Sequence, residues 1–263
     1  MLTNNKSAKI ASAVVDHGFY GRKYGKSVGF YASLNCSMFV GDNDSSVSQN
    51  LDIVKNEFQC KKLITLQQVH SNLCVTVGLL TLSMIEADAM VTAESGVAIG
   101  VLTADCAPIL FMDIENPIVG AAHAGWRGAV AGIIEATIEK MTKLGSKASN
   151  IVAVIGPCIH RNSYEINNDF RRNFNDGDDC FSEMNHEIHF DLPKYCYRRL
   201  IKAGLDVDNL DVTAIDTYAD PENYFSYRFA MKNTSGICGR NISVICLRTE
   251  HGNNSYQRYK GAC

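Results

Sequence analysis

The sequence predicts an α+β fold in which β-hairpins are mixed with strand–helix units. Apolar runs at 108–112 and 118–122 flank a short polar segment, which is the pattern of a hairpin. An amphipathic segment at 129–144 and a β-type run at 151–155 follow it. Because strands and helices do not alternate regularly along the chain, the pattern favours mixed sheets flanked by helices over a doubly wound parallel sheet.

The first hundred residues are expected to hold one helix and several short strands. Val47, Leu51, Val54 and Phe58 recur at three- and four-residue spacing, which predicts a helix over 45–58. The other elements expected in this part are an opening strand at 10–15, a glycine-rich loop at 17–31 and strands at 63–66, 88–92 and 97–103.

The second half is expected to be richer in helix. An apolar stripe runs along 129–144, and Gly145 follows as a stop signal, so this segment is predicted to be one long helix. The later elements expected are helices at 164–174 and 192–203, strands at 211–215 and 242–247, and a polar tail at 248–263 that frays.

Length and composition indicate one globular domain, residues 1–263. Hydrophobic residues make up 46% and charged residues 20%, which is enough apolar material for a sizeable core. The net charge of −3 argues against a broad electrostatic grip on nucleic acid. No apolar stretch reaches the roughly 18 residues of a membrane span. We therefore expect neither nucleic acid nor a membrane as a partner.

The ten cysteines are expected to be reduced thiols. They are scattered without a Cys-x-x-Cys pair, and the polar stretch 1–9 shows no secretory signal. Disulfides persist mainly in oxidising compartments. The sequence therefore predicts a cytoplasmic protein.

Three separate segments each contain one residue that can bind a metal: His70, Cys106 and His123. Two imidazoles and one thiolate suit a catalytic zinc, because three protein ligands leave a fourth position open. Zinc in such a site can lower the pKa of bound water from about 15.7 to about 7. Taken singly, each residue has a simpler interpretation as a buried cysteine or a hydrogen-bonded histidine. The spacings are long, so only the fold can bring the three side chains together.

The sequences around these residues carry a family resemblance. Gln-Val-His70-Ser, Thr-Ala-Asp-Cys106-Ala-Pro and His123-Ala-Gly-Trp-Arg-Gly, in this order, resemble the YfiH or laccase-like polyphenol oxidase family. Further matching segments are 17–19, 31–35, 40–42, 87–92, 155–159, 164–165 and 225–228. The resemblance spans the chain from His17 to about Leu247 and implies a layered α/β/β/α sandwich. It also implies that His70, Cys106 and His123 bind zinc and are catalytic.

Several polar residues are candidates for binding substrate. Arg127 follows His123 at an expected helix start, where it either contacts an anion or lies over Trp126 as a surface arginine. The resemblance adds weight to Arg228 and, to a lesser degree, to Arg22. The predicted substrate-binding residues are Arg22, Asn35, Arg127 and Arg228.

The roles of three further residues are left open. Asp105 can orient a ligand histidine, move a proton or cap a turn. Cys158 follows Gly-Pro at an expected helical turn, where a helix N-terminus would favour a reactive thiolate. A buried structural cysteine is the more common case. Arg240 is a further candidate for an anion contact.

The leading hypothesis, taken from the resemblance, is a zinc-dependent enzyme of purine nucleosides. It would phosphorolyse adenosine, inosine, guanosine or methylthioadenosine, and it would deaminate adenosine. In zinc deaminases a metal-activated water attacks the base while a carboxylate transfers protons, a role open to Asp105 or Glu165. Phosphorolysis needs a cationic cradle for phosphate, which Arg22, Arg127 and Arg228 can supply.

Three alternatives stay open. Cys106 can be the nucleophile of a thiol hydrolase with His123 or His70 as its base, and some members of the resembling family are described as amidases that edit peptidoglycan precursors. Copper can replace zinc in the same site and oxidise phenols, because copper(II) binds nitrogen and sulfur ligands more tightly. Seven histidines without a His-x-His pair argue against a four-copper cluster. A purely structural zinc would need a fourth protein ligand.

Overall fold

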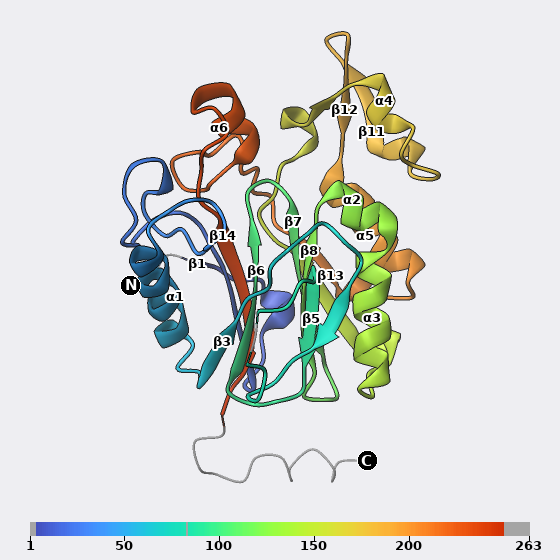
Figure 1. Cartoon of the computed structure of the whole chain (residues 1–263). Helices are drawn as coiled ribbons and strands as arrows, with labels where there is room; N and C mark the ends of the chain where they lie inside the picture. The colour runs from blue at the N-terminus through green and yellow to red at the C-terminus, as the bar shows by residue number, and fades with distance from the viewer. Residues whose placement is uncertain (1–3, 83, 250–263) are drawn as a thin grey trace.

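Two β-sheets lie face to face with helices on both outer sides, as a computed structural model covering residues 4–82 and 84–249 describes (Figure 1). The five-stranded sheet has the order β1 (Asn4–Asn5), β2 (Val15–Tyr20), β14 (Asn241–Leu247), β6 (Val97–Thr103) and β3 (Lys62–Ile64). The six-stranded sheet has the order β13 (Leu210–Val212), β9 (Ile151–Ile155), β7 (Ala107–Asp113), β8 (Val119–Ala124), β5 (Ala89–Thr92) and β4 (Cys74–Thr76). The predicted α+β class and the layered sandwich are confirmed.

Helices cover the outer face of each sheet. Helix α1 (Asp44–Glu57) packs on the five-stranded sheet, and α3 (Ile133–Lys143) and α5 (Leu192–Lys202) pack on the six-stranded sheet (Figure 1). The shorter helices are α2 (Trp126–Ala131), α4 (Asn168–Arg171) and α6 (Tyr227–Asn233). Among the described residues, no helix has both the length and the apolar character needed to cross a membrane.

Side chains that alternate along the strands fill the space on both sides of each sheet. In β6, Val97, Ile99 and Val101 belong to the core between the two sheets, whereas Ala98 and Leu102 belong to the core beneath α1. Strands β7 and β9 divide their side chains in the same way between the central core and the α3–α5 layer. Because both faces are covered, these strands appear in the sequence as continuous apolar runs.

A small third sheet projects beyond the sandwich, at the upper right of Figure 1. It has the order β10 (Glu165–Ile166), β12 (Glu187–Phe190) and β11 (Phe181–Met184). Its rings join those of α2, α4 and α5 in an aromatic cluster made of Trp126, Tyr164, Phe170, Phe174, Phe181, Phe190 and Tyr195. Such ring pairs are each worth about 0.5–1.5 kcal/mol beyond the area they bury. The cluster therefore fixes the small sheet against the start of α2.

Most of the expected elements are confirmed, including the helix at 45–58, the β7–β8 hairpin and the helix at 192–203. The nine cysteines among the described residues are free. The predicted fraying of the 248–263 tail falls, apart from its first two residues, outside the described part of the chain.

Several expectations about elements are wrong. The segment 129–144 is not one helix, because Gly132 takes the left-handed φ of 97° and separates α2 from α3. The opening strand starts only at Val15, because Ile10 lies in a buried 3₁₀ turn instead. The segment 164–174 forms a strand and the short α4, since its aromatic residues pack into the aromatic cluster rather than along one helix face.

His17 lies in β2 rather than in the expected loop, and it holds the N-terminal segment. The backbone N–H of Ser7 donates a hydrogen bond of 2.9 Å to the Nε2 atom of the buried His17 imidazole. Burial and the charge of Lys6 lower the pKa of His17 to about 4, although Asp16 opposes this shift. The imidazole is therefore neutral in the folded protein at neutral pH, and protonation would remove the acceptor.

We predict that acid destabilises the fold partly through His17. In the unfolded chain its pKa returns to about 6.5, so protonation increasingly favours the unfolded state as pH falls from 6.5 towards 4. The urea midpoint should drop more between pH 7 and pH 5 in the parent protein than in His17→Gln, whose amide oxygen can still accept the Ser7 hydrogen bond without titrating. An equal drop in both proteins would show that His17 has no part in the acid response.

Candidate metal centre

The three predicted metal ligands meet at one end of the six-stranded sheet. Cys106 immediately precedes β7, and His123 is the next-to-last residue of β8, where it pairs with Pro108 of β7. His70 comes from the loop between β3 and β4. Two of the three side chains are thus carried by neighbouring strands, and the third is brought to them by a loop.

The geometry suits one small metal ion. The Nε2 atom of His70 lies 3.9 Å from the Sγ atom of Cys106, and the ligand atoms of all three residues lie within 4.8 Å of one another. Zinc ligands at about 2.0–2.3 Å from the ion are separated from each other by about 3.3–3.8 Å, so only a small contraction is needed. His70 is exposed, Cys106 half-buried and His123 buried, which means that the site opens to the surface on the His70 side.

Asp88 is the residue that orients the histidine ligands. Its Oδ1 atom lies 2.8 Å from Nδ1 of His123, and it also accepts the backbone N–H of His70 at 2.9 Å. The other carboxylate oxygen accepts both the backbone N–H and the hydroxyl of Ser71. Because His123 donates its Nδ1 proton to Asp88, its Nε2 atom is left to bind a metal.

The loop that carries His70 is held by a second side chain. The Gln68 amide donates to the carbonyl oxygen of Leu102 and accepts the Leu102 N–H, both at 2.7 Å. It thus forms the two hydrogen bonds that a neighbouring strand would form with the end of β6. His70 itself has a positive φ of 61°, an arrangement that needs surrounding support in a residue other than glycine. The hydrogen bonds from Gln68 and to Asp88 supply that support on either side.

Gly125 provides the space for the ligands at the end of β8. A Cβ atom at this position would lie 2.9 Å from the Sγ atom of Cys106 and 3.0 Å from Cδ2 of His70. The φ of Gly125 is −69°, which any residue can adopt. Its lack of a side chain therefore serves the close approach of Cys106 and His70, not a turn conformation.

The titrating groups of the centre form a coupled network. Burial disfavours the Cys106 thiolate, but the charges and hydrogen bonds of His123 and His70 outweigh it and lower the pKa of Cys106 to about 6. Burial likewise disfavours protonated His123, but Cys106 and Asp88 raise its pKa to about 9. Burial opposes ionisation of Asp88 too, yet the bonds from His123 and Ser71 lower its pKa to about 2. The thiolate required of a zinc ligand is thus favoured at neutral pH.

The structure decides between the alternatives that were left open for Asp105 and Cys158. Asp105 accepts the Thr217 hydroxyl at 2.7 Å and the backbone N–H of Arg228 at 2.6 Å, so it anchors the start of α6. The idea that Asp105 orients a ligand histidine is therefore wrong, and Asp88 has this role. Cys158 lies fully buried in an extended connection rather than at a helix start, and burial raises the pKa of its thiol well above normal. The reactive-thiolate interpretation of Cys158 is wrong for that reason.

Arg22, Asn35 and Arg240 are engaged within the protein. Arg22 donates to two backbone carbonyl oxygens at 2.7 and 2.9 Å. The buried Asn35 amide donates to Asp42 at 2.9 Å and accepts the backbone N–H of Arg240 at 2.9 Å. The Arg240 guanidinium donates to two carbonyl oxygens of its own loop. These contacts organise the loops beside the sheet ends, and substrate contacts by Arg22 and Asn35 stay predictions.

Arg127 and Arg228 lie at the starts of two different helices. Arg127, in the first turn of α2, is exposed, stacks 4.4 Å from the Trp126 ring centroid and has no ion pair among residues 4–82 and 84–249. Arg228, in the first turn of α6, donates twice to the carbonyl oxygen of Glu165 at 3.0 Å. Of the two interpretations of Arg127, the structure shows the surface arginine that lies over Trp126. An anion contact by Arg127 and Arg228 stays a prediction.

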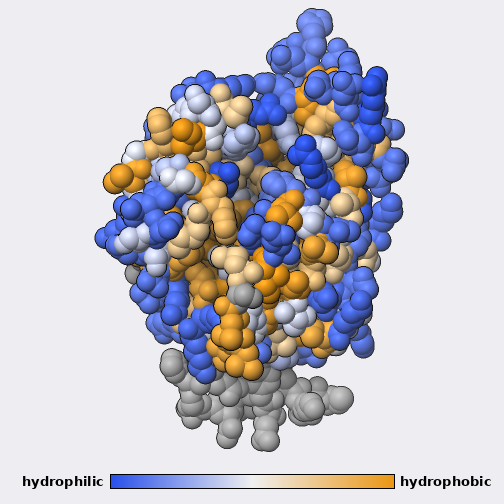
Figure 2. Space-filling view, in the orientation of Figure 1, coloured by the Kyte–Doolittle hydropathy of each residue, from blue (hydrophilic) through white to orange (hydrophobic). Residues whose placement is uncertain are grey.

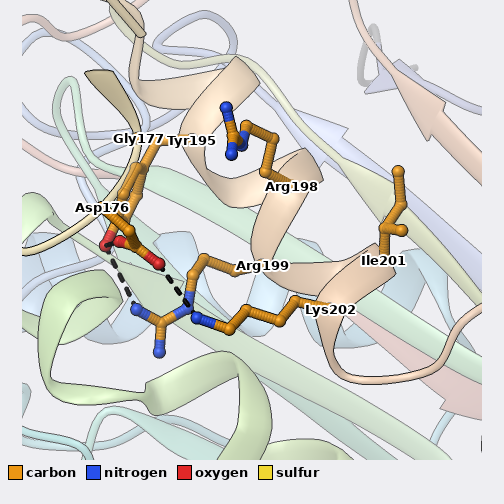
Figure 3. Close-up of a pocket in the computed structure, with 7 residues that line it drawn as sticks. All are labelled: Asp176, Gly177, Tyr195, Arg198, Arg199, Ile201 and Lys202. Carbon is orange, nitrogen blue, oxygen red and sulfur yellow. Dashed lines mark hydrogen bonds and ion pairs between the residues drawn. The ribbon is translucent and has the colours of Figure 1, made fainter. Parts of the chain in front are cut away.

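A hollow of about 400 Å³ lies elsewhere, on α5. Its lining is formed by Asp176, Gly177, Tyr195, Arg198, Arg199, Ile201 and Lys202 (Figure 3). Lys202 pairs with Asp176 at 3.1 Å and Arg199 with Glu135 at 2.5 Å, and Arg198 also contacts a carboxylate. Its cations are already neutralised, so this hollow is a weaker anion site than the surroundings of Arg127.

The fold and the site define a class of protein: a layered α+β sandwich with a His-Cys-His candidate metal site at the end of one sheet. The chain belongs to the family described as multi-copper polyphenol oxidoreductase laccase, which matches residues 16–248. Its fold is similar to that of the Bacillus licheniformis protein YfiH, with a TM-score of 0.83 and 25% identity, covering 89% of this chain and 93% of that one. The Neisseria meningitidis protein NMB0706 has the same TM-score at 28% identity, covering 94% and 99%.

Several relatives carry the name of one enzyme. A Deinococcus radiodurans protein named purine nucleoside phosphorylase is 33% identical over 254 residues, covering 93% of this chain and 94% of the relative. A Rickettsia conorii protein with the same enzyme name is 34% identical over 193 residues, covering 71% of this chain and 78% of the relative.

We predict that Asp88→Asn weakens zinc binding by about 10- to 100-fold, the usual effect of removing such a supporting carboxylate. The amide keeps the size of the side chain but cannot accept all the hydrogen bonds that converge on it. Competition with a chromophoric chelator would measure the affinity. Asp113→Asn, at a second buried aspartate that only caps its own turn, is the control. Equal zinc affinities in the two variants would show that Asp88 does not support metal binding.

Proposed function

We propose that this chain is a zinc-dependent purine nucleoside phosphorylase that also deaminates adenosine. The observation that carries the proposal is the cluster of His70, Cys106 and His123, which offers two imidazoles and one thiolate on an open side of the fold. Three protein ligands leave room for a reactant, and zinc bound there would supply Lewis-acid catalysis. The relatives named purine nucleoside phosphorylase support nucleosides and phosphate as the substrates.

The charges around the cluster suit a phosphate co-substrate. One thiolate and two neutral imidazoles would leave a zinc centre with a net charge of about +1, which favours anions. Arg127, four residues after His123 in the chain, adds an exposed guanidinium. Arg22 is held in place by backbone carbonyl oxygens, and Arg228 by the carbonyl oxygen of Glu165 and by an ion pair of 3.6 Å with its carboxylate. Their remaining N–H groups are already oriented before a ligand arrives.

Hydrophobic side chains near α6 suit a purine base. Figure 2 shows apolar residues gathered at the upper left, where Figure 1 places α6 and the loop before α1. Exposed members on these two segments include Phe30, Phe39, Tyr227 and Met231. Small-molecule sites commonly combine apolar walls with a few fixed polar groups. A nucleoside presents a flat apolar base and a polar sugar, which matches this combination.

A second candidate function uses the same residues without a metal. The Cys106 thiol contacts the His123 imidazole, which in turn contacts the Asp88 carboxylate. This is the arrangement of a thiol hydrolase. An amidase acting on peptidoglycan precursors would fit this chemistry. Copper-dependent phenol oxidation is a third outcome at the same ligands, since the described residues contain one group of three that can hold a metal.

We predict that His70→Ala, Cys106→Ala and His123→Ala each lose bound zinc and nucleoside turnover while remaining folded. Elemental analysis would give the zinc content, and a nucleoside panel assayed with and without phosphate would separate phosphorolysis from deamination. His186→Asn and Cys60→Ala, at a turn histidine and a second half-buried cysteine, serve as controls. Stoichiometric zinc in Cys106→Ala would rule out the three-ligand site. Activity that survives chelation but not alkylation would favour the thiol hydrolase.

We also predict that Arg127→Ala impairs phosphorolysis more than deamination, because only phosphorolysis needs the phosphate anion. The KM for phosphate should rise about tenfold or more, as expected for loss of a charge-assisted contact. Arg171→Ala is a suitable control, since Arg171 also stacks on a ring of the aromatic cluster, Phe181, but lies in α4. Equal losses in both reactions would assign Arg127 a general positioning role instead.

A further inference from the structure

Tyr164 is the member of the aromatic cluster that also contacts Arg228. It directly precedes β10, and its ring packs against Phe170 and Phe190 with centroids 5.9 and 5.7 Å away. The guanidinium of Arg228 lies over the same ring at 5.2 Å. The phenol is therefore fixed by rings on one side and by a cation on another, and it has little freedom to reorient.

The same packing links Tyr164 to the second arginine of the site. Arg127 stacks on Trp126 at 4.4 Å, and Trp126 packs on Phe170 at 4.8 Å. Phe170 in turn contacts Tyr164. Three rings in series thus connect the two guanidinium groups at the starts of α2 and α6. Cation–π contacts of this kind hold arginines in place while leaving N–H donors for a ligand.

The Tyr164 hydroxyl has no hydrogen bond to any residue that the structure describes, unlike that of Tyr195 in the same cluster. The Tyr195 hydroxyl donates to Asp176 and accepts from Arg199, both at 3.1 Å. The Tyr164 side chain is half-buried, and its unpaired hydroxyl reaches solvent. The hydroxyl is therefore free to donate to a ligand atom.

Arg228 links this phenol to the metal centre, because the backbone N–H of Arg228 donates to Asp105, the residue before Cys106. Burial raises the pKa of Tyr164 above its usual range, and the negative charges of Cys106 and Asp105 add to the effect. Arg228 and Arg127 oppose it. The phenol is therefore a protonated donor at neutral pH, and the charges of Cys106 and of both arginines act on it.

We propose that Tyr164 positions the phosphate co-substrate: its hydroxyl donates a hydrogen bond to a phosphate oxygen that Arg127 and Arg228 attract beside the metal centre. The inference rests on the proposed phosphorolysis and assigns the phosphate a specific donor. A neutral donor flanked by two guanidinium groups favours an oxyanion without adding a further charge to the site. The aromatic series keeps the three groups at fixed separations.

The test compares Tyr164→Phe with Tyr195→Phe, which removes a hydroxyl from the same cluster on the side of the α5 hollow (Figure 3). Calorimetric titration of the zinc-loaded proteins with inorganic phosphate should show a Kd about tenfold higher for Tyr164→Phe, the effect of one lost hydrogen bond to a charged oxygen. The KM for phosphate should rise by a similar factor, with kcat and the KM for nucleoside changed less than about twofold. Tyr195→Phe should bind phosphate like the parent protein.

The outcomes separate this inference from the proposed function. A parent protein that binds phosphate through Tyr164 but shows no phosphorolysis would contradict the proposed reaction and keep the phosphate contact. Phosphorolysis with identical phosphate Kd and KM in the parent and in Tyr164→Phe would overturn the inference and leave the reaction intact. Absence of phosphate binding by the parent protein would overturn the inference directly. Equal zinc content and circular dichroism in all three proteins would show that the comparison reports binding rather than folding.

Discussion

The buried carboxylate of Asp88 joins two of the three chain segments from which the candidate metal centre is built, those of His70 and His123. It receives hydrogen bonds from the backbone of His70, from Ser71 and from the imidazole of His123, and its own carbonyl oxygen accepts the His123 backbone N–H at 2.7 Å. An ionised carboxylate buried to this extent is stable only when its oxygens are satisfied. The same bonds also set the direction of the His123 imidazole and hold the backbone of His70, so the local fold and the site geometry share one network.

The two kinds of support in the centre have different physical origins. Cys106 and His123 are placed by the pairing of β7 with β8, which the central core holds from both sides. His70 depends on side-chain hydrogen bonds from Gln68 and to Asp88 instead. Sheet pairing is backed by many buried contacts, whereas a loop held by a few bonds opens at lower free energy. The exposed histidine is therefore the ligand whose position depends most on single residues.

The α+β class could be predicted from the sequence because apolar runs and helical stripes follow directly from burial on the two sheet faces, whereas the layered arrangement was implied only by the family resemblance. The three ligand positions could be named from their local segments, which lie where β7 begins, where β8 ends and in the loop before β4. Asp88 was missed, although an acidic residue at the edge of the apolar run 87–92 is a signal in itself, since a charge buried there needs partners. The break at Gly132 was missed because a glycine is tolerated inside many helices, and nothing local shows that its φ is positive.

Long-range contacts account for the other differences. The spacing of Tyr164, Phe170 and Phe174 was interpreted as a helix, but their partners lie in α2 and in the β11–β12 hairpin, far away along the chain. Asp105 stands next to a metal ligand in the sequence yet points to Thr217 and Arg228. Asp105 has a positive φ of 87° in the bend between β6 and β7, so adjacency to Cys106 carried no information about contact with the histidines.

Trp126 is the only tryptophan of the chain, and its indole has Arg127 on one side and Phe170 on another. It follows His123 by three residues and also belongs to the packing that holds the small sheet. Its intrinsic fluorescence is therefore an internal optical probe at the junction of two parts of the molecule. Any event that moves the guanidinium off the indole, or separates the small sheet from α2, changes the surroundings of one identified chromophore, without a label and without interference from a second tryptophan.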